Sequence, residues 1–232
     1  MSLGIIGGMG PMATVYFMEL VVDMTEAHAD GDHLEMIVYN CPSIPDRTKY
    51  IIGESEESPL PKMMEIGQRL QEQAVDCVAI PCMTAHYFYD DLKSLGIPVI
   101  HAIRETAQVL KEKGITRAAL MATDGTISSG IFQRELERLG IEAVLPDSAY
   151  QKKIMDIIYE DIKAGVMPAP EKVSELKDYF INERGAQSVV LGCTELSLLK
   201  KPFALGEDFI DTLEVLAEKA ILACGKQVKK EI

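Results

Sequence analysis

Apolar residues along the chain form short continuous runs that alternate with longer stretches of helical spacing. Continuous runs are typical of strands buried in a parallel sheet, and spacing of three to four residues is typical of an amphipathic helix. The alternation predicts an α/β protein with mostly parallel sheets. We expect strands at residues 3–7, 34–40, 76–82, 97–101, 117–123, 141–146 and 188–193, and helices at 12–24, 61–73, 84–95, 102–113, 131–139, 149–164, 170–183 and from about 211.

The two halves of the chain resemble each other. Residues 9–17 (MGPMATVYF) align with residues 124–132 (DGTISSGIF), and residues 78–86 (VAIPCMTAH) align with residues 189–197 (VVLGCTELS). A third pair, residues 99–110 and 209–220, follows in the same order at a similar offset. Matches at a nearly constant offset indicate an internal duplication. Ligands bind at the carboxyl ends of the strands in such open sheets, so we expect one cleft between two facing lobes.

Cys82 and Cys193 follow matching strands in the two halves, each at the predicted start of a helix. Helix N-termini carry partial positive charge, which favours the thiolate. Two thiols across a cleft can remove a proton from one face of a carbon and return one to the other face, which inverts the centre. Contact distances of about 3–3.5 Å to that carbon place the sulfurs roughly 7 Å apart. The alternative to a catalytic role is that a free cysteine serves only as a small buried residue of the core. This is our interpretation of Cys41, Cys77 and Cys224.

Composition and charge exclude several classes of function. The net charge is −13 with no basic stripe, which argues against nucleic acid and anionic membranes as partners. No apolar run reaches the roughly 18 residues of a membrane-spanning helix, and the first residues lack a signal peptide, so we expect a cytoplasmic protein. No CxxC pair suggests structural zinc, and the GGMGP turn does not match the dinucleotide-binding pattern GxGxxG.

Five motifs together resemble the aspartate/glutamate racemase family, and most closely its aspartate racemase branch: GIIGGMGPMAT, IPDRT, PCMTAH, LMATDGTISSGIFQ and LGCTEL. The resemblance spans nearly the whole chain. It implies two pseudo-symmetric lobes, each a mostly parallel open sheet flanked by helices. Residues 1–100 with 209–232 would form the first lobe, and residues 101–208 the second, because the last helix of the family returns to the first lobe. The resemblance also implies a homodimer and a racemase that needs no cofactor or metal.

The resemblance assigns roles to individual residues. Cys82 and Cys193 would be the paired acid and base. Arg47 of IPDRT matches the family arginine that binds the distal carboxylate of the substrate, a role that suits a guanidinium fork. Lys163 resembles the lysine that adds a second positive charge there, so a small dicarboxylic amino acid is the expected substrate. The remaining expected residues are Thr84 and Thr194 at the α-carboxylate, Thr123 and Thr126 at the mouth of the second lobe, and Asp46 and Glu195 behind the substrate contacts.

One position departs from the family pattern. Met83 follows the first cysteine, where the family usually has asparagine. Methionine cannot replace the hydrogen bonds of an amide, so this residue leaves the substrate open. Aspartate racemase is the preferred interpretation. The alternatives are a related isomerase, racemase or decarboxylase of another small carboxylate such as glutamate, maleate or a hydantoin, and a non-catalytic dicarboxylate-binding protein.

Overall fold

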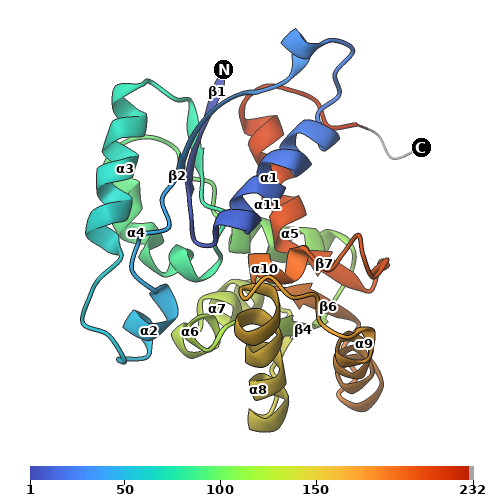
Figure 1. The fold of residues 1–232 in the computed structure, drawn as a ribbon. Coiled ribbons are helices and arrows are strands. Elements are labelled where there is room, and N and C mark those ends of the chain that lie inside the picture. Colours follow the sequence, from blue (N-terminus) through green and yellow to red (C-terminus); the bar gives the residue numbers. More distant parts are fainter. Residues whose placement is uncertain (230–232) are drawn as a thin grey trace.

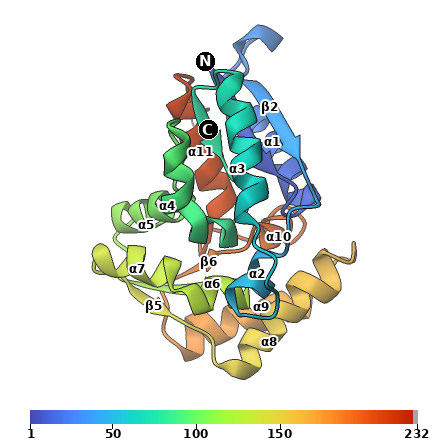
Figure 2. The same ribbon diagram turned by 90° about the vertical axis from the view of Figure 1, so that its left-hand side faces the viewer.

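Two parallel sheets form the framework of the protein. The computed structural model describes residues 1–229, and Figures 1 and 2 show one sheet above the other, each flanked by helices. The first sheet has the order β2-β1-β3 and the second β5-β4-β6-β7, with every pairing parallel. The α/β prediction is therefore confirmed. The strands are β1 (Ser2–Gly7), β2 (Glu35–Asn40), β3 (Cys77–Ala79), β4 (Arg117–Met121), β5 (Glu142–Val144), β6 (Ser188–Leu191) and β7 (Phe209–Asp211).

Both sheets have the same strand order. In each, the first strand in the chain lies at the centre, with the second strand on one side and the third on the other. β7 extends the second sheet beside β6, and its counterpart in the first lobe is a single parallel bridge from Val78 to Val99. The strand expected at 97–101 is thus reduced to that bridge. β7 lies in the second sheet, although we expected residue 209 onward in the first lobe.

The helices of the first lobe surround its sheet. They are α1 (Pro11–Met24), α2 (Arg47–Ile51), α3 (Leu60–Glu72), α4 (Tyr89–Leu92) and α5 (Ala102–Glu112), with 3₁₀ turns η1 (Asp30–Asp32), η2 (Thr84–Phe88) and η3 (Lys93–Leu95). The single helix expected over 84–95 was wrong, because η2, α4 and η3 divide this segment. The His86 ring accounts for part of the break: it contacts the Cys82 carbonyl and accepts from the Ala102 amide, which holds η2 against the start of α5.

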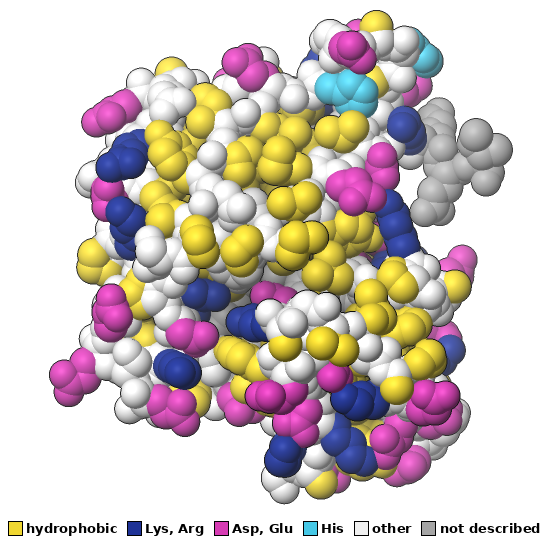
Figure 3. Space-filling model, in the orientation of Figure 1, with side chains coloured by type: hydrophobic (Ala, Val, Ile, Leu, Met, Phe, Trp, Pro, Cys, Tyr) yellow, Lys and Arg dark blue, Asp and Glu magenta, His cyan; other side chains and the backbone are white. Residues whose placement is uncertain are grey.

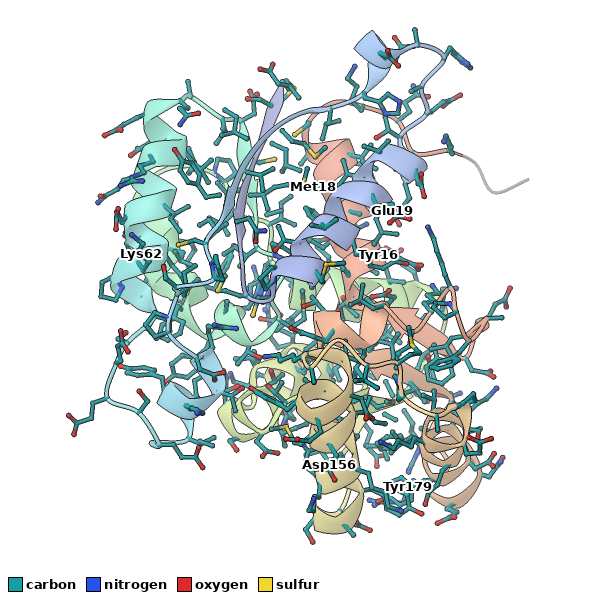
Figure 4. All side chains as sticks on the ribbon, in the orientation of Figure 1. Tyr16, Met18, Glu19, Lys62, Asp156 and Tyr179 are labelled. Carbon is teal, nitrogen blue, oxygen red and sulfur yellow. The ribbon has the colours of Figure 1, made fainter. Side chains whose placement is uncertain are left out.

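The helices of the second lobe lie around its sheet, in the lower half of Figure 2. They are α6 (Asp124–Ser129), α7 (Ile131–Arg138), α8 (Ser148–Asp156), α9 (Pro170–Asp178) and α10 (Thr194–Ser197). α8 and α9 continue as π-helical turns, η4 (Ile157–Ile162) and η5 (Tyr179–Glu183), so the predicted lengths of these two helices are nearly right. Figure 4 labels Asp156, the last residue of α8, and Tyr179, the first residue of η5.

The last helix joins the lobes. α11 (Thr212–Ala223) follows β7 of the second sheet, and its buried face packs against α1 and α5. Its side chains share one apolar core with β1 and α1 of the first lobe and with β4 of the second. Asp211 caps α11 and His101 caps α5, and these two residues occupy matching positions of the aligned segments 99–110 and 209–220. Within residues 1–229, no helix has the length and apolar character that a membrane crossing needs.

Candidate active site

Cys82 and Cys193 line the same buried cavity between the two sheets. Each follows the carboxyl end of a third strand, β3 or β6, and the side chains are 5% and 6% exposed. The cavity measures about 10 Å³, which is room for about one water molecule. An amino acid therefore needs the lobes to separate before it can reach the two sulfurs.

A larger cavity of about 540 Å³ adjoins this chamber. Arg47, Lys163 and Glu195 line both cavities, so these three charged side chains form the boundary between them. Gly8, Gly10 and Pro11 of the turn after β1 border the larger cavity. Figure 3 shows a hollow near the middle of this face, with basic side chains and an acidic one inside it. The larger cavity is the approach by which a small ligand would reach the chamber.

The guanidinium of Arg47 is buried and held by the backbone. Nη1 donates to the carbonyls of Ile44 and Pro45, and Nη2 donates to the Met9 carbonyl. Nε is also buried and has no hydrogen-bond partner among the described residues. Burial alone would lower the pKa of Arg47, but the nearby Cys82 and Asp46 raise it above its usual value. A fixed, charged donor without a partner suits a carboxylate ligand.

The opposite wall contains Cys193, Glu195 and Lys163. Cys193 Sγ donates to Glu195 Oε2 at 3.1 Å, and Lys163 Nζ lies 3.9 Å from Glu195 Oε1. Burial, followed by the charge of Glu195, raises the pKa of the Cys193 thiol well above its usual value. This is opposite to our expectation for a thiol at a helix N-terminus, because α10 is only four residues long and the carboxylate lies beside the sulfur.

Three threonine hydroxyls join the lobes beside the cavity. Thr84 of η2 contacts Thr123 at 3.0 Å and Thr126 at 2.9 Å, and those two hydroxyls are 3.1 Å apart. Thr84 and Thr123 line the small cavity, whereas Thr126 lies behind them. Thr194 donates across the lobes to the Pro81 carbonyl at 3.3 Å. These hydroxyls are therefore part of the contact between the lobes as well as of the cavity wall.

Asp46 and Met83 lie at different places around the two cavities. Asp46 caps α2 by accepting from the Lys49 amide, and it accepts from the Tyr159 hydroxyl at 3.4 Å. It lines the larger cavity only. Met83 is 1% exposed, packs in the apolar core and lines the small cavity, where it offers no strong hydrogen bond.

Sequence reasoning missed three residues of the small cavity, namely Met9, Thr48 and Tyr159. Tyr159 precedes Lys163 by four residues, and the ammonium lies 4.2 Å from the centre of its ring, so helical spacing was the signal that could have found it. Burial raises the pKa of Tyr159. Across residues 1–229 no group of three or more His, Cys, Asp or Glu is arranged to hold a metal ion.

Comparison with known proteins identifies the family of the chain. Residues 6–220 match the model of the Asp/Glu/Hydantoin racemase family. The chain belongs to this family. The broad specificity amino-acid racemase of Bacillus subtilis is 26% identical over 225 residues, which cover 94% of this chain and 96% of that protein.

Solved structures of the family have the same two-sheet architecture. The aspartate racemase of Picrophilus torridus superposes with a TM-score of 0.80 at 31% identity, covering 99% of this chain and 97% of that one. An aspartate racemase homologue from Pyrococcus horikoshii gives 0.77 at 24% identity, covering 97% and 99%, and supports the fold alone. This protein is accordingly an isomerase of the amino-acid racemase family.

Proposed function

We propose that this racemase inverts the α-carbon of an amino acid without a cofactor, with Cys82 and Cys193 as the two acid–base groups and aspartate as the first expected substrate. The observation that carries the proposal is that both cysteines line one buried chamber. One sulfur, as thiolate, removes the α-proton, and the other, as thiol, delivers a proton to the opposite face. The proton count is then unchanged, but the two sulfurs have exchanged protonation states.

The charges around the chamber support a carboxylate substrate. Arg47 offers a buried Nε without a partner among the described residues, and Lys163 adds a second positive charge at the same boundary. Both stabilise the negative charge that develops when the α-proton leaves, and they act in a water-poor site. We assign the α-carboxylate to the hydroxyls of Thr84, Thr123 and Thr194, with Thr126 and Asp46 as their supports. Closure of the lobes over the substrate would exclude water.

A broader choice of amino acids is the second candidate. Part of the charge of Lys163 is compensated by Glu195 at 3.9 Å, so a second carboxylate on the substrate is less strongly required. Met83 supplies no amide at the position where the family has one. The similar Bacillus subtilis protein is named for broad specificity. We also expect a homodimer, which light scattering on the purified protein tests.

The test is incubation with L-aspartate in heavy water. Loss of the α-proton signal together with appearance of D-aspartate on a chiral column supports the proposal, and a panel of other amino acids separates the two substrate ranges. We expect Cys82→Ser and Cys193→Ser each to abolish racemisation while retaining α-proton exchange on one enantiomer. Cys41→Ser, outside the small cavity, is the matched control. Full activity of Cys82→Ser contradicts the two-thiol mechanism.

A further inference from the structure

The two cysteines of the chamber have neighbours of opposite charge. Cys82 lines the small cavity together with Arg47, and the two are close enough for Cys82 to raise the pKa of that guanidinium. Cys193 lies beside the carboxylate of Glu195 and donates to it at 3.1 Å. A cation stabilises a thiolate and an anion destabilises one. The pseudo-symmetry of the lobes therefore does not extend to the charge at the sulfurs.

Glu195 is fixed in this position. Its Oε2 accepts from Cys193 and, at 3.4 Å, from the Thr194 hydroxyl. A Cβ placed on Gly10 would lie 2.9 Å from Oε1, so the carboxylate occupies space that only a glycine at this position leaves open. The side chain is 5% exposed. The hydrogen bonds to Oε2 and the burial of the side chain together hold the carboxylate beside the sulfur.

The other charged groups around Cys193 do not cancel this carboxylate. Lys163, whose nitrogen lies 3.9 Å from Oε1, offsets only part of the charge of the carboxylate. Tyr159, a phenol that is neutral near pH 7, adds no charge, and burial raises its pKa further. The guanidinium of Arg47 interacts with Glu195 and, more strongly, with Cys82. Burial, and after it the charge of Glu195, therefore raise the pKa of the Cys193 thiol well above its usual value.

We propose that Glu195 is a positioning residue that keeps the proton on Cys193, so that Cys193 is the acid of the resting site and the role of base falls to Cys82. This inference rests on the proposed two-thiol function. The resting protein would then accept the enantiomer whose α-hydrogen faces Cys82. After one turnover Cys82 carries the proton and Cys193 is a thiolate beside Glu195, and a proton must return to Cys193 before the next turnover in the same direction.

This asymmetry has a defined kinetic signature. The equilibrium constant between two enantiomers is one, so kcat/KM must be equal for both directions. Unequal protonation therefore appears as kcat and KM values that differ between the enantiomers by the same factor. Glu195→Gln, which keeps the shape and removes the charge, should reduce that factor. It should also lower the pH at which Cys193 becomes a thiolate.

Alkylation of the free protein by iodoacetamide, with peptide mapping by mass spectrometry, tests the proposal directly. Both sulfurs line one cavity, so access is shared and the labelling ratio reports the thiolate fraction. We expect Cys82 to be labelled before Cys193 in the unsubstituted protein at neutral pH. In Glu195→Gln, labelling of Cys193 should rise about tenfold for each unit by which its pKa falls. Glu207→Gln, an exposed acidic position, is the matched control.

Equal labelling of the two cysteines in the unsubstituted protein overturns the inference, and so does unchanged labelling of Cys193 in Glu195→Gln. The mapping of the unsubstituted protein decides the question even where the variant does not fold. Labelling needs no turnover, so a protein that racemises nothing would refute the proposed function without affecting this test. A racemase with symmetric labelling and equal kcat values would refute only the role of Glu195.

Discussion

Gly125 of α6 lies against Thr48 of α2, and this contact joins the lobes beside Arg47. A Cβ built on Gly125 lies 2.8 Å from Thr48 Cα and 3.0 Å from its Oγ1. Carbon atoms in ordinary contact are about 3.5–4.0 Å apart, so Gly125→Ala must move α2 by about 1 Å. The neighbouring Arg47 moves with it. A misplacement of that size costs about 10²-fold in rate, and we expect kcat/KM to fall by about that factor.

Gly125→Ala tests the position of Arg47 without weakening the helix that carries the substitution. Alanine is favoured over glycine in a helix by about 1 kcal/mol, so α6 itself is not weakened. The assay is kcat/KM for the amino acid that the protein turns over fastest, measured by chiral chromatography beside the melting temperature. Gly206→Ala, where a Cβ meets open space, is the control. A Gly125→Ala protein within about twofold of the parent in kcat/KM refutes the reasoning that this contact positions Arg47.

Three further predictions concern stability. Burial, with Glu214 nearby, raises the pKa of Asp211 to about 6. The folded protein then keeps a proton that the unfolded chain loses, so this residue should lower the free energy of unfolding by roughly 3 kcal/mol as the pH rises from about 4 to above 6. Urea titrations at both pH values should show that the parent loses this amount relative to Asp211→Asn. An equal change of unfolding free energy with pH in the two proteins contradicts the prediction. Thr84→Val leaves the two partner hydroxyls without their shared contact and should cost about 1–3 kcal/mol in the same titration, whereas Thr84→Ser should cost less. The sulfurs of Cys77 and Cys224 lie 3.4 Å apart, although the residues are 147 positions apart in the sequence. Diamide takes up the two thiol hydrogens, and the disulfide that forms should stabilise the folded protein by about 5 kcal/mol and raise its melting temperature. Cys224→Ser should show no rise.

Sequence patterns predicted that Cys82 and Cys193 lie at equivalent strand ends, because apolar runs and aligned segments can both be recognised in the sequence. Continuous apolar runs located β3 and β6, and the aligned segments placed Cys82 and Cys193 at equivalent ends. The topology then brings both to one chamber. Arg47 and Lys163 also line it, although neither lies in the aligned segments, and their inclusion depended on the family resemblance.

The local environment of each sulfur could not be predicted in this way. Whether Glu195 opposes or assists the thiol depends on a rotamer, on burial and on the room left by Gly10, and none of these has a periodic signal. The segment at 84–95 has helical spacing, but the contacts of His86 divide it into short turns. Tertiary contacts decided both outcomes.

The path of α11 has a consequence for any attempt to divide this protein. Leu213, Leu216 and Ala217 are completely buried in a core that β1 and α1 of the first lobe share. A fragment that ends after residue 100 would expose the surface that these side chains cover. Two fragments divided at this point would assemble only if the second fragment supplied α11 to the first, so the two lobes depend on each other to fold.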